Sequence, residues 1–196
     1  MSPLGLIRTV TLLALLLCAG CKTFITYPGP ALPASEEVTV TCFWRNYFVY
    51  LEECHISAVD GRRPGILEIE GLSAKLNPGS HWVEFGVEHY FGGGGGLSDV
   101  CVFERDFEAG HTYHLKAHSL EFDASWLRKR DLAVYGGSIE IQDTDPNGQS
   151  SSYRVNTTCS FGGGSFCRKK EDCVDHPDIV CRPQEGQAFG RCTFDH

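Results

Sequence analysis

Residues 81–91 read HWVEFGVEHYF, and this stretch decides the fold class. Within it, Val83 and Phe85 alternate with Trp82 and Glu84, so every second side chain falls on the same side of the chain. A period of two is that of a β-strand, because successive side chains of a strand point to opposite faces of its sheet. The stretch therefore predicts a strand with one face on a hydrophobic core.

The same alternation returns on both sides of this stretch, and turn-forming Gly, Pro, Asn and Asp residues separate the runs. Many short strands at roughly even spacing are typical of a β-sandwich. We therefore predict a mainly β chain, with a disulfide-stapled β-sandwich over residues 38–158 and a small cysteine-rich module over residues 159–196. The runs that carry the prediction are VTVTCFW at 38–44, ILEIEGL at 66–72, DVCVFERDF at 99–107, HTYHLKAH at 111–118 and SIEIQD at 138–143.

Composition sets limits on function. Hydrophobic residues make up 42% of the 196 residues and charged residues 21%, as in an ordinary folded chain. The formal net charge is -8, from 17 Lys and Arg against 25 Asp and Glu. Binding to a phosphate backbone needs a basic surface, so a nucleic acid is not an expected partner.

The N-terminus has the features of an export signal. In residues 1–21, MSPLGLIRTVTLLALLLCAGC, Arg8 precedes an apolar run over residues 10–17. The run is shorter than the about 20 residues that a transmembrane helix needs. Its end, Cys18-Ala19-Gly20-Cys21, resembles the bacterial lipobox, in which small residues precede a cysteine.

The lipobox resemblance implies where the protein is processed and located. It implies removal of residues 1–20 as a signal peptide and acylation of Cys21, palmitate included, with residues 21–37 as a tether. Lys22 follows the cysteine, and similarity to enterobacterial sorting rules then favours the outer membrane. We expect a lipid-anchored protein of the bacterial envelope that faces the periplasm or the cell surface. The membrane is thus a partner through the acyl anchor.

Cysteine parity predicts structural disulfides. Without Cys18 and Cys21, eight of the ten cysteines remain, an even number, as an oxidising compartment favours. Within these eight no C-x-x-C redox motif or C-x2-4-C zinc pair occurs. We expect Cys42, Cys54, Cys101 and Cys159 to staple the larger domain, and Cys167–Cys181 and Cys173–Cys192 to bridge the C-terminal segment, which has no apolar run for a core of its own.

Two family resemblances add to this picture. The frame of residues 59–61 (VDG), 76–81 (LNPGSH), 107–113 (FEAGHTY) and 139–145 (IEIQDTD) resembles small bacterial envelope lipoproteins with a PEGA-type or transthyretin-like β-domain. That resemblance implies an envelope domain without known catalysis. The C-terminal cysteines resemble small modules of secreted proteins, the Dickkopf type among them, and imply a binding or capping module.

Two patterns offer metal chemistry. His111, His114 and His118 form H-x2-H-x3-H, and imidazoles bind zinc or copper. On a strand, however, His114 and His118 are about 13 Å apart, which favours solvent-facing histidines and no metal site. Residues 143–148, DTDPNG, match the first half of an EF-hand loop, but Arg154 occupies the position of its bidentate acid. We predict a hairpin turn there.

No sequence pattern of nucleophilic or metal-dependent hydrolysis occurs, so we expect no enzyme, no catalytic residue and no cofactor. The expected function is that of a scaffold or binding module for another envelope component, either a protein or a glycan. Two alternatives stay open, namely periplasmic metal handling by the three histidines and surface adhesion through the C-terminal module. Binding would use sheet edges and the aromatic residues Trp82, Tyr90, Phe91 and Trp126.

Overall fold

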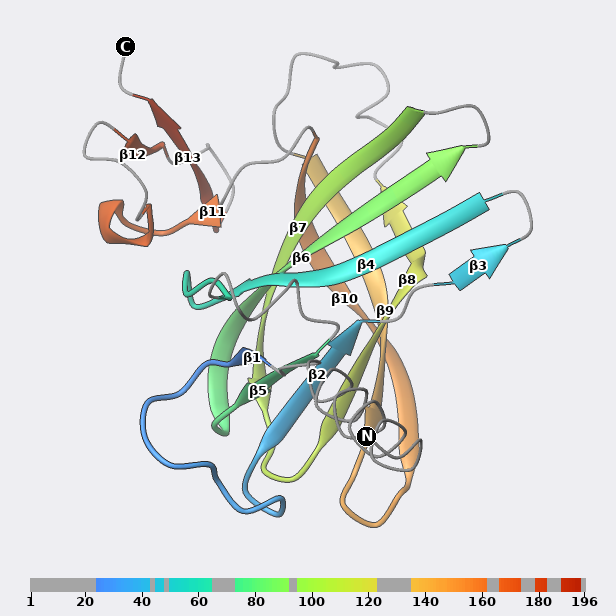
Figure 1. Ribbon diagram of the computed structural model, residues 1–196, viewed down its shortest axis with the longest axis vertical. Coiled ribbons are helices and arrows are strands. Elements are labelled where there is room, and N and C mark those ends of the chain that lie inside the picture. Colours follow the sequence, from blue (N-terminus) through green and yellow to red (C-terminus); the bar gives the residue numbers. More distant parts are fainter. Residues whose placement is uncertain are drawn as a thin grey trace, which may run out of the picture.

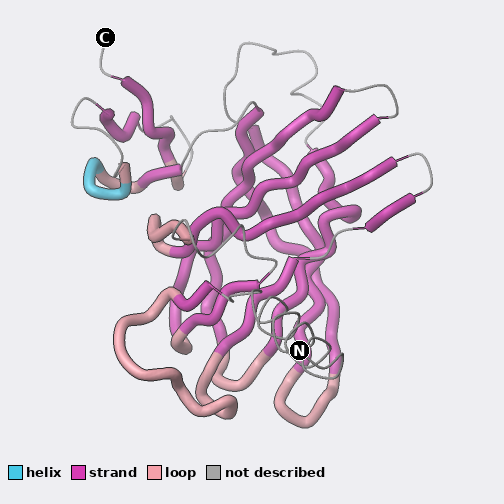
Figure 2. The backbone as a smooth tube through the Cα atoms, viewed as in Figure 1, coloured by secondary structure: helices cyan, strands magenta, loops and turns pink. Residues whose placement is uncertain are grey.

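The computed structural model describes residues 24–42, 45–47, 50–64, 73–91, 95–122, 135–161, 166–173, 179–182 and 188–194. Cys21, the expected signal peptide and Trp126 lie outside these residues, as do the side chains of Tyr90 and Phe91. Nearly all of the described regular structure is β (Figures 1 and 2). The elements are β1 (Phe24–Ile25), β2 (Val38–Cys42), β3 (Arg45–Tyr47), β4 (Tyr50–Val59), β5 (Ser73–Leu76), β6 (Gly79–Phe91), β7 (Gly95–Phe107), β8 (Thr112–Phe122), β9 (Tyr135–Thr144), β10 (Ser150–Phe161), β11 (Phe166–Cys167), η3 (Lys170–Asp172), β12 (Ile179–Arg182) and β13 (Gly190–Phe194).

Ten strands form one continuous sheet, in the order β1-β5-β2-β8-β9-β10-β7-β6-β4-β3. The pairs β1–β5 and β2–β8 are parallel and the other neighbours are antiparallel. The Cys42–Cys54 disulfide joins β2 to β4, which lie far apart in that order, so the sheet curls until its two parts face each other. The prediction of a mainly β, disulfide-stapled fold is confirmed, and its two layers are parts of one curled sheet.

The interior of the curl is the hydrophobic core. Val83 and Phe85 of β6 point into it, while Trp82 and Glu84 point outward, as the alternation predicts. Tyr113 lies at the centre of an aromatic group, with its ring 4.9 Å from that of Phe107. Each fully buried side chain of this size contributes about 1.5–3 kcal/mol to stability.

Four disulfides hold the described part of the chain together. Cys42–Cys54 and Cys101–Cys159 lie within the large sheet, and Cys167–Cys181 and Cys173–Cys192 lie within the C-terminal module. These are the two groups expected from the sequence, and the two C-terminal pairs are the expected ones. A disulfide contributes about 2–4 kcal/mol, mainly by restricting the unfolded chain.

Three residues of the segment expected as a tether over residues 21–37 are buried, although most of residues 28–36 are exposed. Phe24 is fully buried and belongs to β1. Tyr27 donates a hydrogen bond of 2.7 Å from its hydroxyl to Glu37, which also pairs with Lys75 at 2.5 Å. The expectation of a free tether does not hold for Phe24 and Tyr27, because isolated aromatic residues among the prolines are buried against the sheet.

The C-terminal module follows β10, which runs to Phe161, so the boundary expected at residue 158 falls inside a strand. The module has its own small sheet, in the order β11-β13-β12. A second hydrophobic cluster joins the module to the outer face of the large sheet, and its members are Trp82, Val102, Phe166 and Phe189. Trp82 of β6 and Val102 of β7, which point outward, are therefore buried under the module. Among the described residues, none forms a helix long and apolar enough to cross a membrane.

Candidate functional site

A groove of about 650 Å³ lies between the outer face of the large sheet and the C-terminal module. Its size is within the range of about 300–1,000 Å³ that is usual for ligand sites. Strands β7, β9 and β10 form its floor, and the module adds the wall. The lining residues are Val102, Phe103, Glu104, Glu121, Gly136, Gly137, Ser138, Asn156, Thr157, Thr158, Ala188 and Phe189.

The floor of the groove is open at Gly136. A Cβ added there would meet no atom within 4 Å, so there is open space beside the backbone of β9 at this point. The next glycine differs, because a Cβ at Gly137 would lie 2.9 Å from both the Glu121 carbonyl oxygen and the Thr157 hydroxyl. Gly136 thus keeps the groove deep, while Gly137 allows close strand packing.

Two ion pairs lie at the rim of the groove. Arg168 of the module pairs with Glu104 of β7, and its guanidinium lies 4.6 Å from the Phe189 ring centre. Arg154 pairs with Glu121 at 3.2 Å. Both carboxylates are more than two-fifths exposed, so each pair contributes little stability. With these two ion pairs the rim of the groove is polar, but its net charge is close to zero.

Glu84 is a buried carboxylate beneath the module. Its side chain is only 2% exposed, and one carboxylate oxygen accepts a hydrogen bond of 2.8 Å from the backbone N–H of Phe166. Burial raises the pKa of Glu84 to about 7, although the Phe166 hydrogen bond and the charge of Arg63 act in the opposite direction. This hydrogen bond is a polar contact between the large sheet and the start of the module.

The strands that flank the groove separate from each other. The β7–β10 ladder runs from the Asp99–Phe161 pair to the Val102–Thr158 pair and ends there. Strand β7 continues to Phe107 paired with β6, and β10 begins at Ser150 paired with β9. Figure 1 shows the two strands diverging below this short ladder. We call this place the β7–β10 fork.

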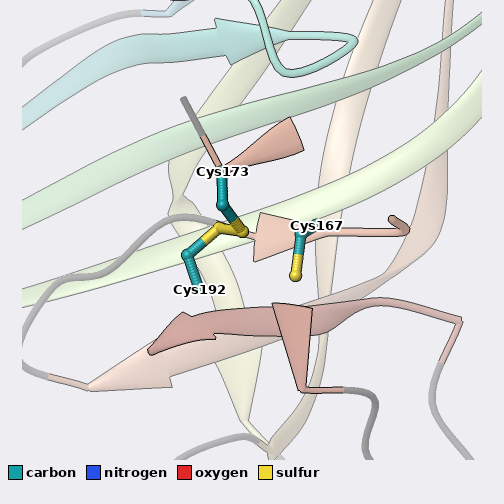
Figure 3. Close-up of side chains that lie close together, drawn as sticks. All are labelled: Cys167, Cys173 and Cys192. Atoms are coloured by element: carbon teal, nitrogen blue, oxygen red, sulfur yellow. A yellow bond between two sulfur atoms is a disulfide. The ribbon is translucent and has the colours of Figure 1, made fainter. Parts of the chain in front are cut away.

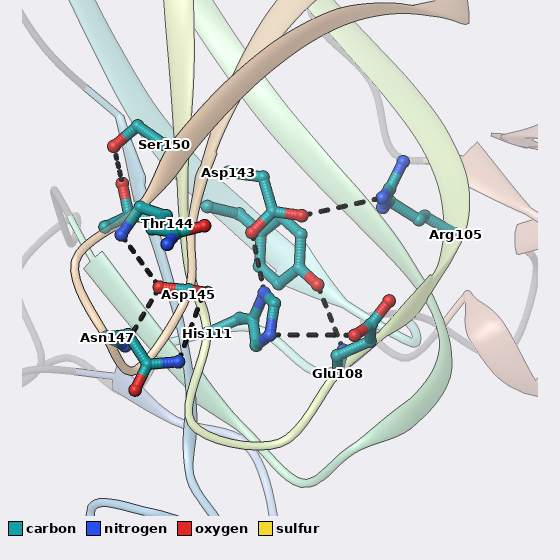
Figure 4. A network of polar contacts seen from close by, with 10 residues as sticks. Arg105, Glu108, His111, Asp143, Thr144, Asp145, Asn147 and Ser150 are labelled. Carbon is teal, nitrogen blue, oxygen red and sulfur yellow. Dashed lines mark hydrogen bonds and ion pairs between the residues drawn. The ribbon is translucent and has the colours of Figure 1, made fainter.

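A polar network lines the inner side of the sheet near the fork (Figure 4). The His111 ring donates a hydrogen bond of 2.8 Å from Nδ1 to Asp143, and its Nε2 lies 3.6 Å from the Glu108 carboxylate. Arg105 lies 3.8 Å from Asp143 and stacks on Tyr153, with its guanidinium 4.1 Å from the ring centre. The sequence analysis singled out two members of this network, His111 as a candidate metal ligand and Asp143 as part of the EF-hand pattern.

The three candidate histidines do not share a ligand position. His111 faces the inner network, whereas His114 shares a hydrogen bond of 2.7 Å with Thr41 and His118 is exposed. Burial lowers the pKa of His114. Tyr113, Leu115 and Ala117 are buried on the opposite face of β8, as the alternation predicts. Among the described residues, the histidines form no group with metal-binding geometry.

Residues 143–148 form the predicted hairpin turn between β9 and β10. The Asp145 carboxylate accepts hydrogen bonds from the backbone N–H groups of Asn147 and Gln149, at 2.9 and 2.8 Å. Gly148 has a φ of +82°, which suits glycine. Asp143 turns away to His111, so the first two acids of the EF-hand pattern do not face one ion (Figure 4).

The C-terminal module contains a compact sulfur cluster (Figure 3). The sulfur atoms of Cys167, Cys173 and Cys192 lie within 4.8 Å of one another. All three belong to disulfides, which take away the thiolates that a metal ion would need. The cluster is therefore the covalent core of the module.

The aromatic residues expected to bind a partner are in part structural. Trp82 is 6% exposed and packs against Phe189, with ring centres 5.4 Å apart. Sequence reasoning missed Glu84 as a buried acid and Gly136 as a groove floor. The available signal for Glu84 was its place among hydrophobic residues in the quoted stretch. No local pattern marks Gly136, because its role depends on the module that lies across the groove.

In comparisons with known proteins, no family, curated protein or solved structure matches the chain. The resemblances to PEGA-type domains and to Dickkopf-type modules therefore stay predictions.

Proposed function

We propose that this protein is a lipid-anchored component of the bacterial envelope and acts, without catalysis, as a binding module or scaffold for another envelope component. The observation that carries the proposal is the groove, which both the large sheet and the cysteine-rich module line. Its mixture of apolar wall and polar floor is typical of a recognition site. The disulfides are typical of chains that mature in an oxidising compartment.

The anchor half of the proposal rests on the export signal and on Cys21. Its test is the intact mass of the chain purified from membranes. We expect cleavage before Cys21 and the added mass of acyl chains, and we expect Cys21→Ala to release the protein from the membrane fraction. An unmodified mass, or membrane retention of the Cys21→Ala chain, would contradict the anchor.

The binding half rests on the groove. A photo-crosslinking side chain at Asn156, on the groove floor, should give a discrete adduct in intact cells. The same side chain at Thr112, exposed at the start of β8, serves as the control. At Gly136 a Cβ meets no atom within 4 Å, so Gly136→Tyr introduces a side chain that occupies the groove, and it should abolish the Asn156 adduct. Equal labelling from both positions, or an adduct that persists in Gly136→Tyr, would refute the groove as the binding site.

A further inference from the structure

The β7–β10 fork leaves one edge of each strand without a neighbour. Over residues 103–107, β7 pairs with β6 alone, and over residues 150–157, β10 pairs with β9 alone. Every strand residue carries a backbone donor and acceptor, and alternate residues direct them to alternate edges. Within the part of the chain that the structure describes, the fork therefore has two rows of backbone N–H and C=O groups that pair with no neighbouring strand.

The edge of β10 also lacks the features that usually block strand addition. Exposed edges are commonly protected by several charged residues or by proline. The β10 edge reads SSSYRVNT over residues 150–157, with Arg154 as its single charge and no proline. Tyr, Val and Thr favour extended structure. The sequence of this edge is compatible with another strand.

The fork opens into the groove. Glu104 of β7 and Asn156 and Thr157 of β10 line the groove, and they lie just beyond the last pair of the ladder. The unpaired strand edges therefore begin at the floor of the groove. Both carboxylates at the rim are already paired with arginines, so the site does not require a charged ligand.

The inner side of the fork is fixed by side chains. Arg105 of β7 reaches over the Tyr153 ring of β10 and toward Asp143 of β9. These contacts tie the separated strands together, and the Cys101–Cys159 disulfide ties them within the ladder itself. The opening is thus held in one geometry, which lowers the entropic cost of filling it.

We propose that the groove binds an extended peptide segment of a partner protein, which adds as a strand to the open edge of β10. The inference rests on the proposed function, because it names the ligand class of the same groove. Main-chain hydrogen bonds provide the affinity in this mode of binding, and side-chain pockets provide the selectivity. A saccharide would instead use side-chain hydroxyl and amide groups such as those of Ser138 and Asn156.

The first measurement is amide hydrogen exchange by NMR on the full chain. In the free protein, alternate amides over residues 150–157 should be protected by β9, and the intervening amides should exchange quickly. Ten-residue peptides are then selected from a random displayed library on the full chain, with counter-selection on Gly136→Tyr. A bound peptide should slow exchange of the fast set by at least tenfold and leave the exposed turn at residues 145–149 unchanged.

The second measurement is a scan of the selected peptide with single backbone N-methyl groups. Each methyl that removes an edge-facing N–H should weaken binding about fivefold or more, the usual net value of one hydrogen bond. Methylation of the intervening residues is the matched control and should have little effect. The losses should therefore follow a period of two. Strand addition is wrong if every selected peptide also binds Gly136→Tyr, or if no peptide is selected. It is also wrong if the affinity losses on N-methylation do not alternate along the peptide.

A parallel arm separates this inference from the proposed function. Neutral oligosaccharides of N-acetylglucosamine are titrated into the wild-type chain and into Gly136→Tyr. If they bind only to the wild-type groove and leave the β10 amides unprotected, strand addition is wrong and the groove remains a binding site. If neither probe binds in a way that depends on Gly136, both the inference and the groove as a binding site are refuted.

Discussion

Glu84 offers a direct test of how the C-terminal module is attached. Its carboxyl group is buried and accepts a hydrogen bond from the backbone N–H of Phe166, and its pKa is raised from 4.5 to about 7. In the folded protein the neutral form therefore predominates below about pH 7. Stability from this group is fully present below pH 4.5 and is lost as the pH rises through 7. The shift corresponds to about 3 kcal/mol at pH 8, at 1.36 kcal/mol per pKa unit.

The substitution Glu84→Gln removes the charge and keeps an oxygen that accepts the hydrogen bond from Phe166. We expect the wild type and Glu84→Gln to unfold with similar free energies at pH 5. At pH 8, Glu84→Gln should be more stable by up to about 3 kcal/mol, because its side chain stays neutral. The assay is urea unfolding with intact disulfides, followed by the fluorescence of Trp82, which lies at the same interface.

The matched control is Glu104→Gln, which removes a carboxylate that is 43% exposed at the rim of the same interface. Its effect should be small and nearly equal at pH 5 and pH 8. If Glu84→Gln changes the unfolding free energy by the same amount at both pH values, the burial argument for Glu84 is wrong.

Three further predictions concern the large sheet. Phe24→Ala should lower the free energy of unfolding by about 3–5 kcal/mol, because the ring is fully buried, and an unchanged urea midpoint would restore the view of this segment as a free tether. Gly137→Ala should cost about 1–3 kcal/mol through its 2.9 Å contacts while Gly136→Ala has little effect, and equal melting temperatures for both variants would contradict the packing described. The hydrogen bond that the His81 ring donates to the Asp60 carboxylate raises the pKa of His81. This pair therefore stabilises the fold below the ordinary pKa of histidine and loses that contribution as the pH rises through the raised value. Asp60→Asn should accordingly destabilise the protein more at pH 5 than at pH 9 in calorimetry, and a pH-independent difference would refute the coupling.

Local pattern was enough to predict the parts of the fold that depend on neighbouring residues. The alternation around Phe85 identified both faces of β6, and the even number of cysteines predicted disulfides such as Cys173–Cys192. Both are short-range or parity arguments, which need no knowledge of the tertiary arrangement. The same type of argument placed Tyr113, Leu115 and Ala117 on one face of a strand, opposite His114 and His118.

The groove could not be predicted in this way. Gly136 and Phe189 are 53 positions apart in the sequence and meet only because the module covers the outer face of the sheet. The alternation of Trp82 and Glu84 suggested a solvent-facing side, yet both are buried, since a second unit packs on them. Burial of both faces of a strand depends on contacts between residues far apart in the sequence. The alternation of side chains along one strand carries no information about these contacts.

The two disulfides of the large sheet have a mechanical consequence. The fork divides the sheet into β1-β5-β2-β8-β9-β10 and β7-β6-β4-β3. Cys101–Cys159 connects these parts on one side and Cys42–Cys54 connects them on the other. A pulling force that separates the two parts therefore acts on sulfur–sulfur bonds after the short ladder of four residue pairs has opened. Under force the two parts of the sheet can separate only as far as these two disulfides allow. Separation beyond that extension requires a reductant that cleaves the disulfides.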